Sequence, residues 1–260
     1  MELYSRDLGG AGKSPLIVLH GMLGSSRNWL GAGAGLSDLW HVHALDLRNH
    51  GKSPHAAGMT YDDLVADVLA WMDRHHIERA DFLGHSMGGK VCMALACRHP
   101  DRVNRLMVVD IAPKSYRSIG SRAEFAAMHE INLRELKSRT EAELKMETRV
   151  PDWGMRKFLT TNLERTDDGG WQWAINLPGI SAALPELEDN PLRESERFSG
   201  AVLFILGGKS RYVAASDHAL IQQHFPAVHI QVLADSGHNP HMQSRAEFQA
   251  AITQWAANED

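Results

Sequence analysis

The residues whose types and spacing most clearly indicate chemistry surround Ser86, in Gly84-His85-Ser86-Met87-Gly88-Gly89. A short apolar run, 80–83, precedes this stretch, and a helical run, 90–98, follows it. A Gly-x-Ser-x-Gly sequence between a strand and a helix is typical of a nucleophile elbow, which holds its serine on a sharp, strained turn. This context favours a nucleophilic serine over an ordinary glycine-rich loop.

A serine hydroxyl becomes an effective nucleophile when a base removes its proton. The best candidate base is His238, which lies in a Gly-His loop between the last expected strand and the last expected helix. His20 and His85 are rivals, but each belongs to another motif. The side chain of His85 should also point away from its neighbour Ser86. The sequence therefore predicts His238 as the general base.

The segment His20 to Ser25 follows the first long apolar strand and has the form of an oxyanion loop. We expect the backbone N–H of Met22 to act together with that of Met87, the residue after the nucleophile. The N–H of Leu23 is the alternative to that of Met22. An ordinary turn at the end of a strand is the non-catalytic interpretation of this segment.

The third member of a triad must orient His238 and favour its protonated form. Asp110, Asp217 and Asp235 are the candidates. Asp235 is only three residues before His238 and is better suited to bracing the loop, and Asp217 is expected to begin a helix. Asp110 ends an apolar strand, which should place it at the same sheet edge as Ser86. We therefore favour Asp110 over Asp217.

Ser210 lies in a loop, 207–212, that has no carboxylate, although many folds of this type carry the acid there. Its hydroxyl could bridge Asp110 and His238 as a relay. The alternative is an ordinary solvated loop serine.

Composition argues against several other classes of protein. The net charge is −5 and the pI is near 6.3, so the chain has no basic footprint for nucleic acid. No apolar run approaches the ~20 residues that span a bilayer, and the N-terminal segment does not resemble a signal peptide. Cys92 and Cys97 are expected to be reduced core residues, which favours a cytoplasmic location. The fifteen histidines show no metal-site spacing, so no metal is expected.

Short apolar runs alternate with amphipathic helical patterns, which predicts an α/β fold with a mostly parallel sheet covered on both faces. The expected strands are 16–19, 42–46, 81–84, 106–110, 202–206 and 230–233. Thr60 and Asp63 predict a capping box for a helix over 61–75. Residues 114–192 contain no convincing strand pair and are interpreted as a helical cap, inserted into a core made of residues 1–113 and 193–260.

With these features the chain resembles the α/β-hydrolase superfamily over nearly its full length. Asp46 to Ser53 adds a D-x-R-x-x-G-x-S segment that is common there. Residues 84–90, 109–113 and 207–213 resemble the YbfF-type esterases, a group that includes the abhydrolase domain 11 proteins. That group places its acid after the superfamily's sixth strand and keeps a serine after the seventh, which supports Asp110 and Ser210. Lys209, and Arg211 where proline is more usual, depart from its pattern.

The resemblance implies hydrolysis of short- to medium-chain acyl esters, or of acyl thioesters, with no cofactor. The residues expected to bind this small-molecule substrate are Leu23, Met87, Tyr116, Met155, Phe158, Trp171, Trp173 and Tyr212, although the aromatic cap residues could instead form the core of the cap. A perhydrolase or an acyltransferase would share the triad. A slowly turning over, ligand-sensing signalling protein would keep the same fold.

Overall fold

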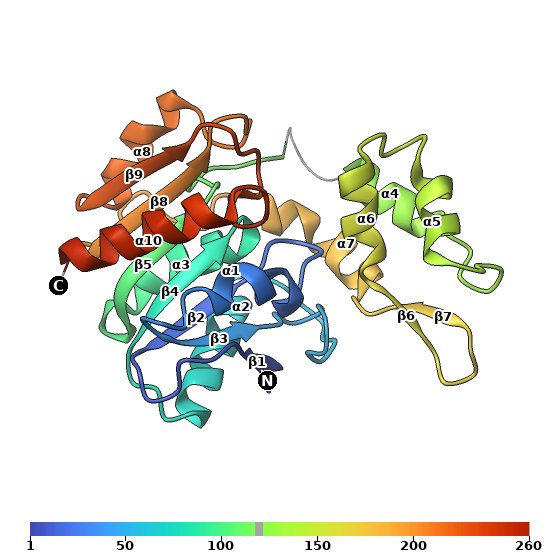
Figure 1. Ribbon diagram of the computed structural model, residues 1–260, viewed down its shortest axis with the longest axis horizontal. Coiled ribbons are helices and arrows are strands. Elements are labelled where there is room, and N and C mark those ends of the chain that lie inside the picture. The colour runs from blue at the N-terminus through green and yellow to red at the C-terminus, as the bar shows by residue number, and fades with distance from the viewer. Residues whose placement is uncertain (118–121, 260) are drawn as a thin grey trace.

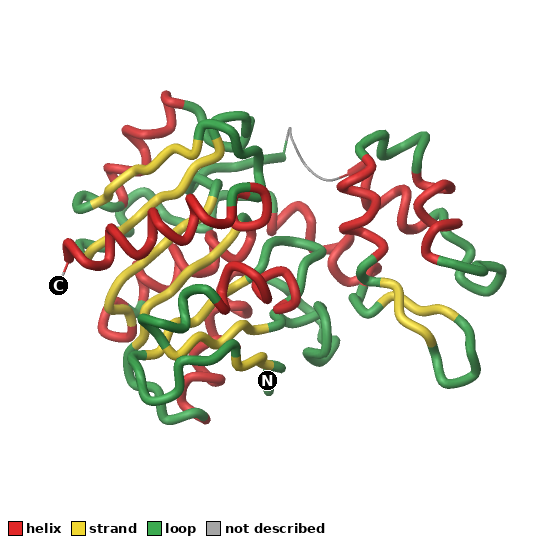
Figure 2. Tube along the Cα trace, viewed as in Figure 1, coloured by secondary structure: helices red, strands yellow, loops and turns green. Residues whose placement is uncertain are grey.

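The computed structural model describes residues 1–117 and 122–259, which form a seven-stranded sheet flanked by helices on both sides (Figures 1 and 2). The strand order is β1-β3-β2-β4-β5-β8-β9, and all neighbours are parallel except β1 and β3. The strands of this sheet are β1 (Ser5–Asp7), β2 (Pro15–Leu19), β3 (His41–Leu45), β4 (Ala80–His85), β5 (Val103–Val109), β8 (Ala201–Gly207) and β9 (Val228–Leu233).

The six expected strands are all present, and the prediction of a mostly parallel α/β sheet is confirmed. The sequence did not predict β1. This strand is three residues long, polar and partly exposed, so it lacks the apolar run that marks the buried strands.

Alternate residues of the central strands enter two separate hydrophobic cores. In β2, Ile17 and Leu19 pack into one core, whereas Leu16 and Val18 pack into the other. The first core contains residues of α2 (Tyr61–Arg74), α3 (Met87–Arg98) and α8 (His218–His224). The second contains residues of α1 (Leu30–Ala34) and α10 (Arg245–Glu259). Burial of both faces explains why these strands are continuously apolar in sequence.

A local sequence signal explains where α2 begins. The predicted capping box of α2 is present, with Thr60 Oγ1 accepting from Asp63 N at 3.1 Å and Asp63 Oδ2 accepting from Thr60 N at 3.0 Å. The short helices are η1 (Ser26–Trp29), η2 (Pro100–Arg102), η3 (Ala215–Asp217) and α9 (Pro240–Gln243). In the described part of the chain, no helix is both long and apolar enough to cross a membrane.

The segment between β5 and β8 forms a separate lobe beside the sheet (Figure 1). It contains α4 (Arg122–His129), α5 (Arg139–Met146), α6 (Trp153–Thr160), β6 (Leu163–Arg165), β7 (Trp171–Trp173) and α7 (Leu177–Leu187). We expected the cap after the sixth strand, and in the structure the lobe follows β5, the fifth strand of the described chain.

The expectation that 114–192 lacks a strand pair is wrong. β6 and β7 pair in an antiparallel hairpin, closed by a turn in which Gly169 has a φ of +83°. Each strand has only three residues, which is too short for an alternating pattern to stand out in the sequence.

Polar contacts fasten the lobe to the core. Tyr61 Oη donates to Leu187 O at 2.6 Å, and Asn162 Nδ2 donates to Leu23 O at 2.9 Å. Lys90 Nζ, from the helix that follows Ser86, donates to three successive carbonyls at the end of α7. These contacts position the lobe over the C-terminal edge of β4 and β5, where ligands bind in folds of this type.

Candidate active site

Ser86 is the single residue between the end of β4 and the start of α3. Its φ of 51° and ψ of −117° lie in a strained region for a residue with a side chain. Hydrogen bonds from Ser86 N to Val109 O and from Lys90 N to Ser86 O hold this conformation. A Cβ on Gly88 would lie only 2.5 Å from Leu19 O, so this glycine allows the helix to approach the sheet.

Asp110 lies at the end of β5, beside the end of β4, and is fully buried. Its Oδ2 accepts a hydrogen bond from His238 Nδ1 at 2.8 Å, and its Oδ1 accepts one from Gly207 N at 2.9 Å. Because the carboxylate accepts a hydrogen bond from Nδ1, the proton of a neutral His238 ring is on Nδ1. The lone pair of Nε2 is then left to take a proton from a nucleophile.

Ser210 donates a short hydrogen bond to Asp110 Oδ2 and accepts one from Tyr212 N at 3.2 Å. No hydrogen bond joins Ser210 to His238 among the described residues. The expected bridge between Asp110 and His238 is therefore absent, because His238 reaches the carboxylate directly. Ser210 instead supplies a further donor to a buried carboxylate, which stabilises its charged form.

The two other candidate acids lie elsewhere. Asp217 Oδ2 is 2.5 Å from Lys114 Nζ and also accepts from Ala214 N. Asp235 is exposed and pairs with Lys209 at 2.8 Å. Both carboxylates are engaged by structural partners, whereas Asp110 contacts His238.

The loop after β2 presents free backbone donors. Among the described residues, the N–H groups of Met22 and Met87 have no protein acceptor, and Met87 is the first residue of a helix, where N–H groups are unpaired. The N–H of Leu23 donates to His50 Nε2 at 3.2 Å. Leu23 is thereby removed as the alternative oxyanion donor, and Met22 and Met87 are left.

Two buried histidines hold this loop in place as neutral rings. His20 Nε2 accepts from Leu47 N at 3.0 Å, and His50 Nε2 accepts from Leu23 N. Burial lowers the pKa of His20 and lowers that of His50 to about 3. The sequence does not predict this role of His50, although the residue lies within the D-x-R-x-x-G-x-S segment.

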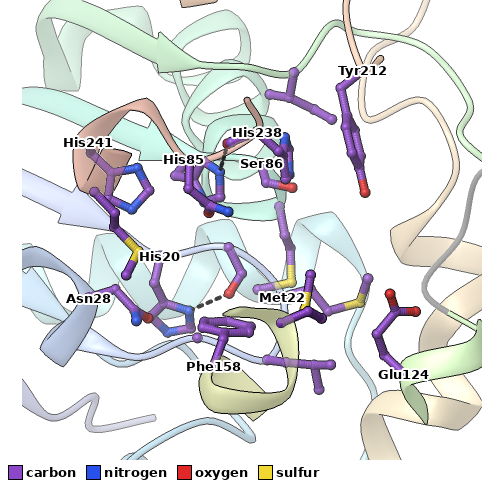
Figure 3. A pocket seen from close by; sticks show the side chains of 18 of the residues that line it. His20, Met22, Asn28, His85, Ser86, Glu124, Phe158, Tyr212, His238 and His241 are labelled. Atoms are coloured by element: carbon purple, nitrogen blue, oxygen red, sulfur yellow. Dashed lines mark hydrogen bonds between the residues drawn. The ribbon is translucent and has the colours of Figure 1, made fainter. Parts of the chain in front are cut away.

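A cavity of about 310 Å³ opens at Ser86 and His238 (Figure 3). The ring of Tyr212 stacks on that of His238, with centroids 3.7 Å apart and planes at 12°. Other predicted substrate-binding residues lie in its wall as well, namely Leu23, Met87, Tyr116, Met155 and Phe158. The structure thus brings residues of both the core and the lobe to one site.

Trp171 and Trp173 do not belong to the described lining of this cavity, so we no longer assign them to substrate binding. Both lie on β7, where Trp173 pairs with Leu163. The guanidinium of Arg165 lies 4.0 Å from the centre of the Trp171 ring. Their aromatic character in the sequence reflects packing within the lobe.

The sequence analysis also missed several residues of the cavity wall. Asn28 comes from η1, His241 from α9, and Lys90 and Glu188 from opposite sides of the lobe boundary. Lys90 follows the nucleophile by one helical turn, which is a signal that could have been used. Nothing in the local sequence pattern marks the other three.

Among the described residues, no group of three His, Cys, Asp or Glu side chains is arranged to hold a metal ion. His20, His85 and His238 instead make hydrogen bonds to backbone groups or to Asp110. The arrangement is suited to acyl transfer by a hydroxyl nucleophile, a base and two oxyanion donors.

Comparisons with known proteins agree with this geometry. The family described as "alpha/beta hydrolase fold" matches residues 14–244. An sn-1-specific diacylglycerol lipase, ABHD11 of Danio rerio, is 35% identical and covers 94% of this chain and 78% of its own length. Esterase YbfF of Escherichia coli is 30% identical, and the match covers 93% of this chain and 92% of the length of YbfF. A solved marine microorganism esterase superposes with a TM-score of 0.94 at 32% identity, covering 98% and 99%.

The chain therefore belongs to the α/β-hydrolase family. Within it, the chain falls in the subgroup of YbfF and ABHD11, as the resemblance predicted. The prediction of a serine ester hydrolase is confirmed at the level of enzyme class by relatives named as esterases and lipases.

Proposed function

We propose that the chain is a carboxylesterase that cleaves short- to medium-chain acyl esters through Ser86, His238 and Asp110. The observation that carries this proposal is the 2.8 Å contact between His238 Nδ1 and a fully buried Asp110, at the sheet edge where Ser86 sits on its strained turn. A buried carboxylate on one ring nitrogen makes the other nitrogen an effective base.

In the proposed reaction, Ser86 Oγ attacks the ester carbonyl while His238 Nε2 takes the hydroxyl proton. The carbonyl electrons move onto oxygen, which the N–H groups of Met22 and Met87 bind. Collapse of this intermediate expels the alcohol, which receives the proton from His238. Water, deprotonated by His238, then attacks the acyl-enzyme; collapse of this second intermediate releases the acid while His238 returns the proton to Ser86 Oγ.

The two N–H groups act mainly in the transition state, because charge develops on the oxygen only then. One such donor is worth roughly 3–4 kcal/mol of barrier lowering. The rigid support of the loop by His20 and His50 means that little reorganisation is needed when the oxyanion forms.

We propose that residues 114–192 act as a cap that completes the acyl pocket. Met155 and Phe158 of α6 face the cavity together with Met87 and Ile111 of the core. A cavity of this size with an apolar wall suits a short or medium acyl chain. The esterase and diacylglycerol lipase relatives support an oxygen ester, and acyl thioesters are an extension of the same chemistry.

We also propose a cytoplasmic location. Cys92 and Cys97 are both free thiols, and burial raises the pKa of each. Unpaired cysteines are compatible with a reducing compartment.

The proposal is tested with a panel of p-nitrophenyl esters from acetate to dodecanoate and the matching acyl-CoA thioesters, at enzyme concentrations that separate a burst from turnover. We expect many turnovers, with the highest kcat/KM at a short or medium chain. A single burst with no further product on every substrate would contradict the proposal and favour a slow, ligand-sensing protein.

A further inference from the structure

The cavity does not end at the apolar acyl pocket. Its wall also includes Asn28, His85 and His241, which come from η1, the end of β4 and α9 and lie to the left of Ser86 in Figure 3. His85 is 6% exposed and His241 is 2% exposed. The proposed reaction uses none of these three side chains.

His85 presents a hydrogen-bond acceptor beside the nucleophile. Its Nε2 donates to the backbone carbonyl of His238 at 2.7 Å, so the ring proton is on Nε2 and Nδ1 carries a lone pair. A Cβ on Gly21 would lie 2.7 Å from His85 Nδ1 and 3.3 Å from Ser86 Cβ. A side chain at Gly21 would therefore collide with the His85 ring, and Gly21, His85 and Ser86 line the same cavity.

Asn28 presents a donor. Its Oδ1 accepts from Ser25 N at 2.7 Å, which identifies the oxygen of the amide and leaves Nδ2 as the other group. No hydrogen bond engages Nδ2 among the described residues. This amide group is therefore available to a ligand in the cavity.

His241 is the third polar group. Its ring stacks on Trp29, with centroids 4.6 Å apart, and its Nδ1 is buried without a partner. No hydrogen bond to Nε2 is present in the described part of the chain, so this nitrogen is also available to a ligand. An unpaired polar ring at such a position is costly unless something else binds it.

This wall is neutral near pH 7. Burial lowers the pKa of His85 well below its usual range and lowers that of His241 to about 3. Of the described residues that line the cavity, Lys90 is the one Lys or Arg, and its ammonium group is engaged by carbonyls at the end of α7. The wall therefore offers hydrogen bonds but no counter-charge for a phosphate or carboxylate.

We propose that His85, Asn28 and His241 form a leaving-group subsite that binds the free hydroxyl groups of a neutral, hydroxylated alcohol. The inference rests on the proposed function, since it assigns the two sides of Ser86 to the acyl chain and to the alcohol. One hydroxyl would donate to His85 Nδ1, and a second would accept from Asn28 Nδ2. A site built in this way rejects an alcohol that lacks the hydroxyl, because its own polar groups are then left unpaired.

The test compares glyceryl monobutyrate with propyl butyrate, two esters that share the acyl group and the carbon count of the alcohol. We measure the ratio of their kcat/KM values in the wild type and in three near-isosteric variants. His85→Gln keeps a donor for the His238 carbonyl but loses Nδ1, Asn28→Asp keeps the acceptor for Ser25, and His241→Phe keeps the stack on Trp29.

We expect the wild type to prefer the glyceryl ester by about tenfold or more and each variant to reduce that ratio by about fivefold, the effect of one neutral hydrogen bond. The exposed control His76→Gln should leave the ratio unchanged. A third ester, butyryl glycerol 3-phosphate, should be cleaved more slowly than the glyceryl ester because its charge has no partner.

Equal cleavage of both neutral esters by the wild type, or an unchanged ratio in all three variants, would overturn the subsite. Faster cleavage of the phosphate ester would also overturn it, in favour of an anion site. Each of these three results leaves the proposed function intact, because that function requires only that esters are hydrolysed. Absence of turnover on every ester would instead contradict the proposed function itself.

Discussion

Asp110 Oδ2 lies 2.8 Å from His238 Nδ1, although the two residues are 128 positions apart in the chain. The contact forms because β5 and β8 are parallel neighbours, and the loops that follow β5 and β9 therefore meet at one sheet edge. Full burial of Asp110 and the donors from Gly207 and Ser210 keep the carboxylate aimed at the ring. This relationship gives the acid its position without any carboxylate in the loop after β8.

The first prediction concerns the identity of the acid. Asp110→Asn removes the negative charge that stabilises a protonated His238, so we expect kcat to fall on the order of 10³–10⁴-fold. Asp217→Asn is the matched control, because its carboxylate contacts Lys114, and it should cost less than about threefold. Steady-state kinetics on p-nitrophenyl butyrate provides the comparison. The reverse ranking would move the acid to Asp217.

The second prediction concerns Ser210. Ser210→Ala removes one donor to the Asp110 carboxylate while the direct contact between Asp110 and His238 persists. Loss of one hydrogen bond to a charged group should lower kcat about tenfold, far less than Asp110→Asn. The pH profile of kcat/KM is the second readout. A loss as large as that of Asp110→Asn would show that Ser210 is an obligatory relay.

The sequence marked Ser86 and the buried strands more clearly than the lining of the pocket. Ser86 and the positions of the strands along the chain follow from local signals, namely a glycine-flanked turn and buried apolar runs, and the strands in turn determine which residues share the sheet edge. The side chains of Trp171 and His241 could not be placed in this way. Whether an aromatic residue faces a cavity or a neighbour depends on packing between distant segments, as with Trp171 beside Arg165.

The hairpin of β6 and β7 and the role of His50 were missed for the same reason. Two strands of three residues carry too little pattern to be recognised. His50 can accept a hydrogen bond from Leu23 N only because its loop folds back onto Leu23, which lies 27 positions away in the chain. Such tertiary contacts determine the conformation of the proposed oxyanion loop, yet they leave no periodic pattern in the sequence.

The third prediction concerns the acyl pocket. Phe158→Ala removes a ring from the part of the wall that the lobe contributes and so enlarges the cavity. The preferred acyl chain of p-nitrophenyl esters should therefore lengthen by about two carbons or more. Trp171→Ala is the control, because this side chain lies outside the cavity wall. The chain-length profile of kcat/KM distinguishes the two variants. A shift with Trp171→Ala and none with Phe158→Ala would place the acyl chain elsewhere.

The fourth prediction concerns stability at acid pH. Burial lowers the pKa of His241 to about 3, whereas an unfolded histidine titrates near 6.5. Between these values the unfolded chain binds a proton that the folded chain does not, so the free energy of unfolding falls as the pH drops from about 6.5 towards 3. After burial, the charge on His238 also lowers the pKa of His241, and the His85 ring packs beside this ring.

His241→Phe should reduce that slope by up to about 1.4 kcal/mol per pH unit, since one titrating group is removed. Urea unfolding at several pH values between 6.5 and 4 measures the slope in both proteins. The exposed variant His76→Gln serves as the control. An unchanged slope in His241→Phe would mean that this ring is protonated in the folded protein.

The most direct test of the whole account is active-site labelling combined with turnover. Purified wild type and Ser86→Ala are treated with a fluorophosphonate, digested and analysed by mass spectrometry, and both are assayed on p-nitrophenyl butyrate. We predict a single adduct on Ser86 in the wild type, and neither adduct nor hydrolysis in Ser86→Ala, with the same thermal midpoint within a few degrees. A folded Ser86→Ala variant that retains ester hydrolysis would contradict the assignment of Ser86 as the nucleophile.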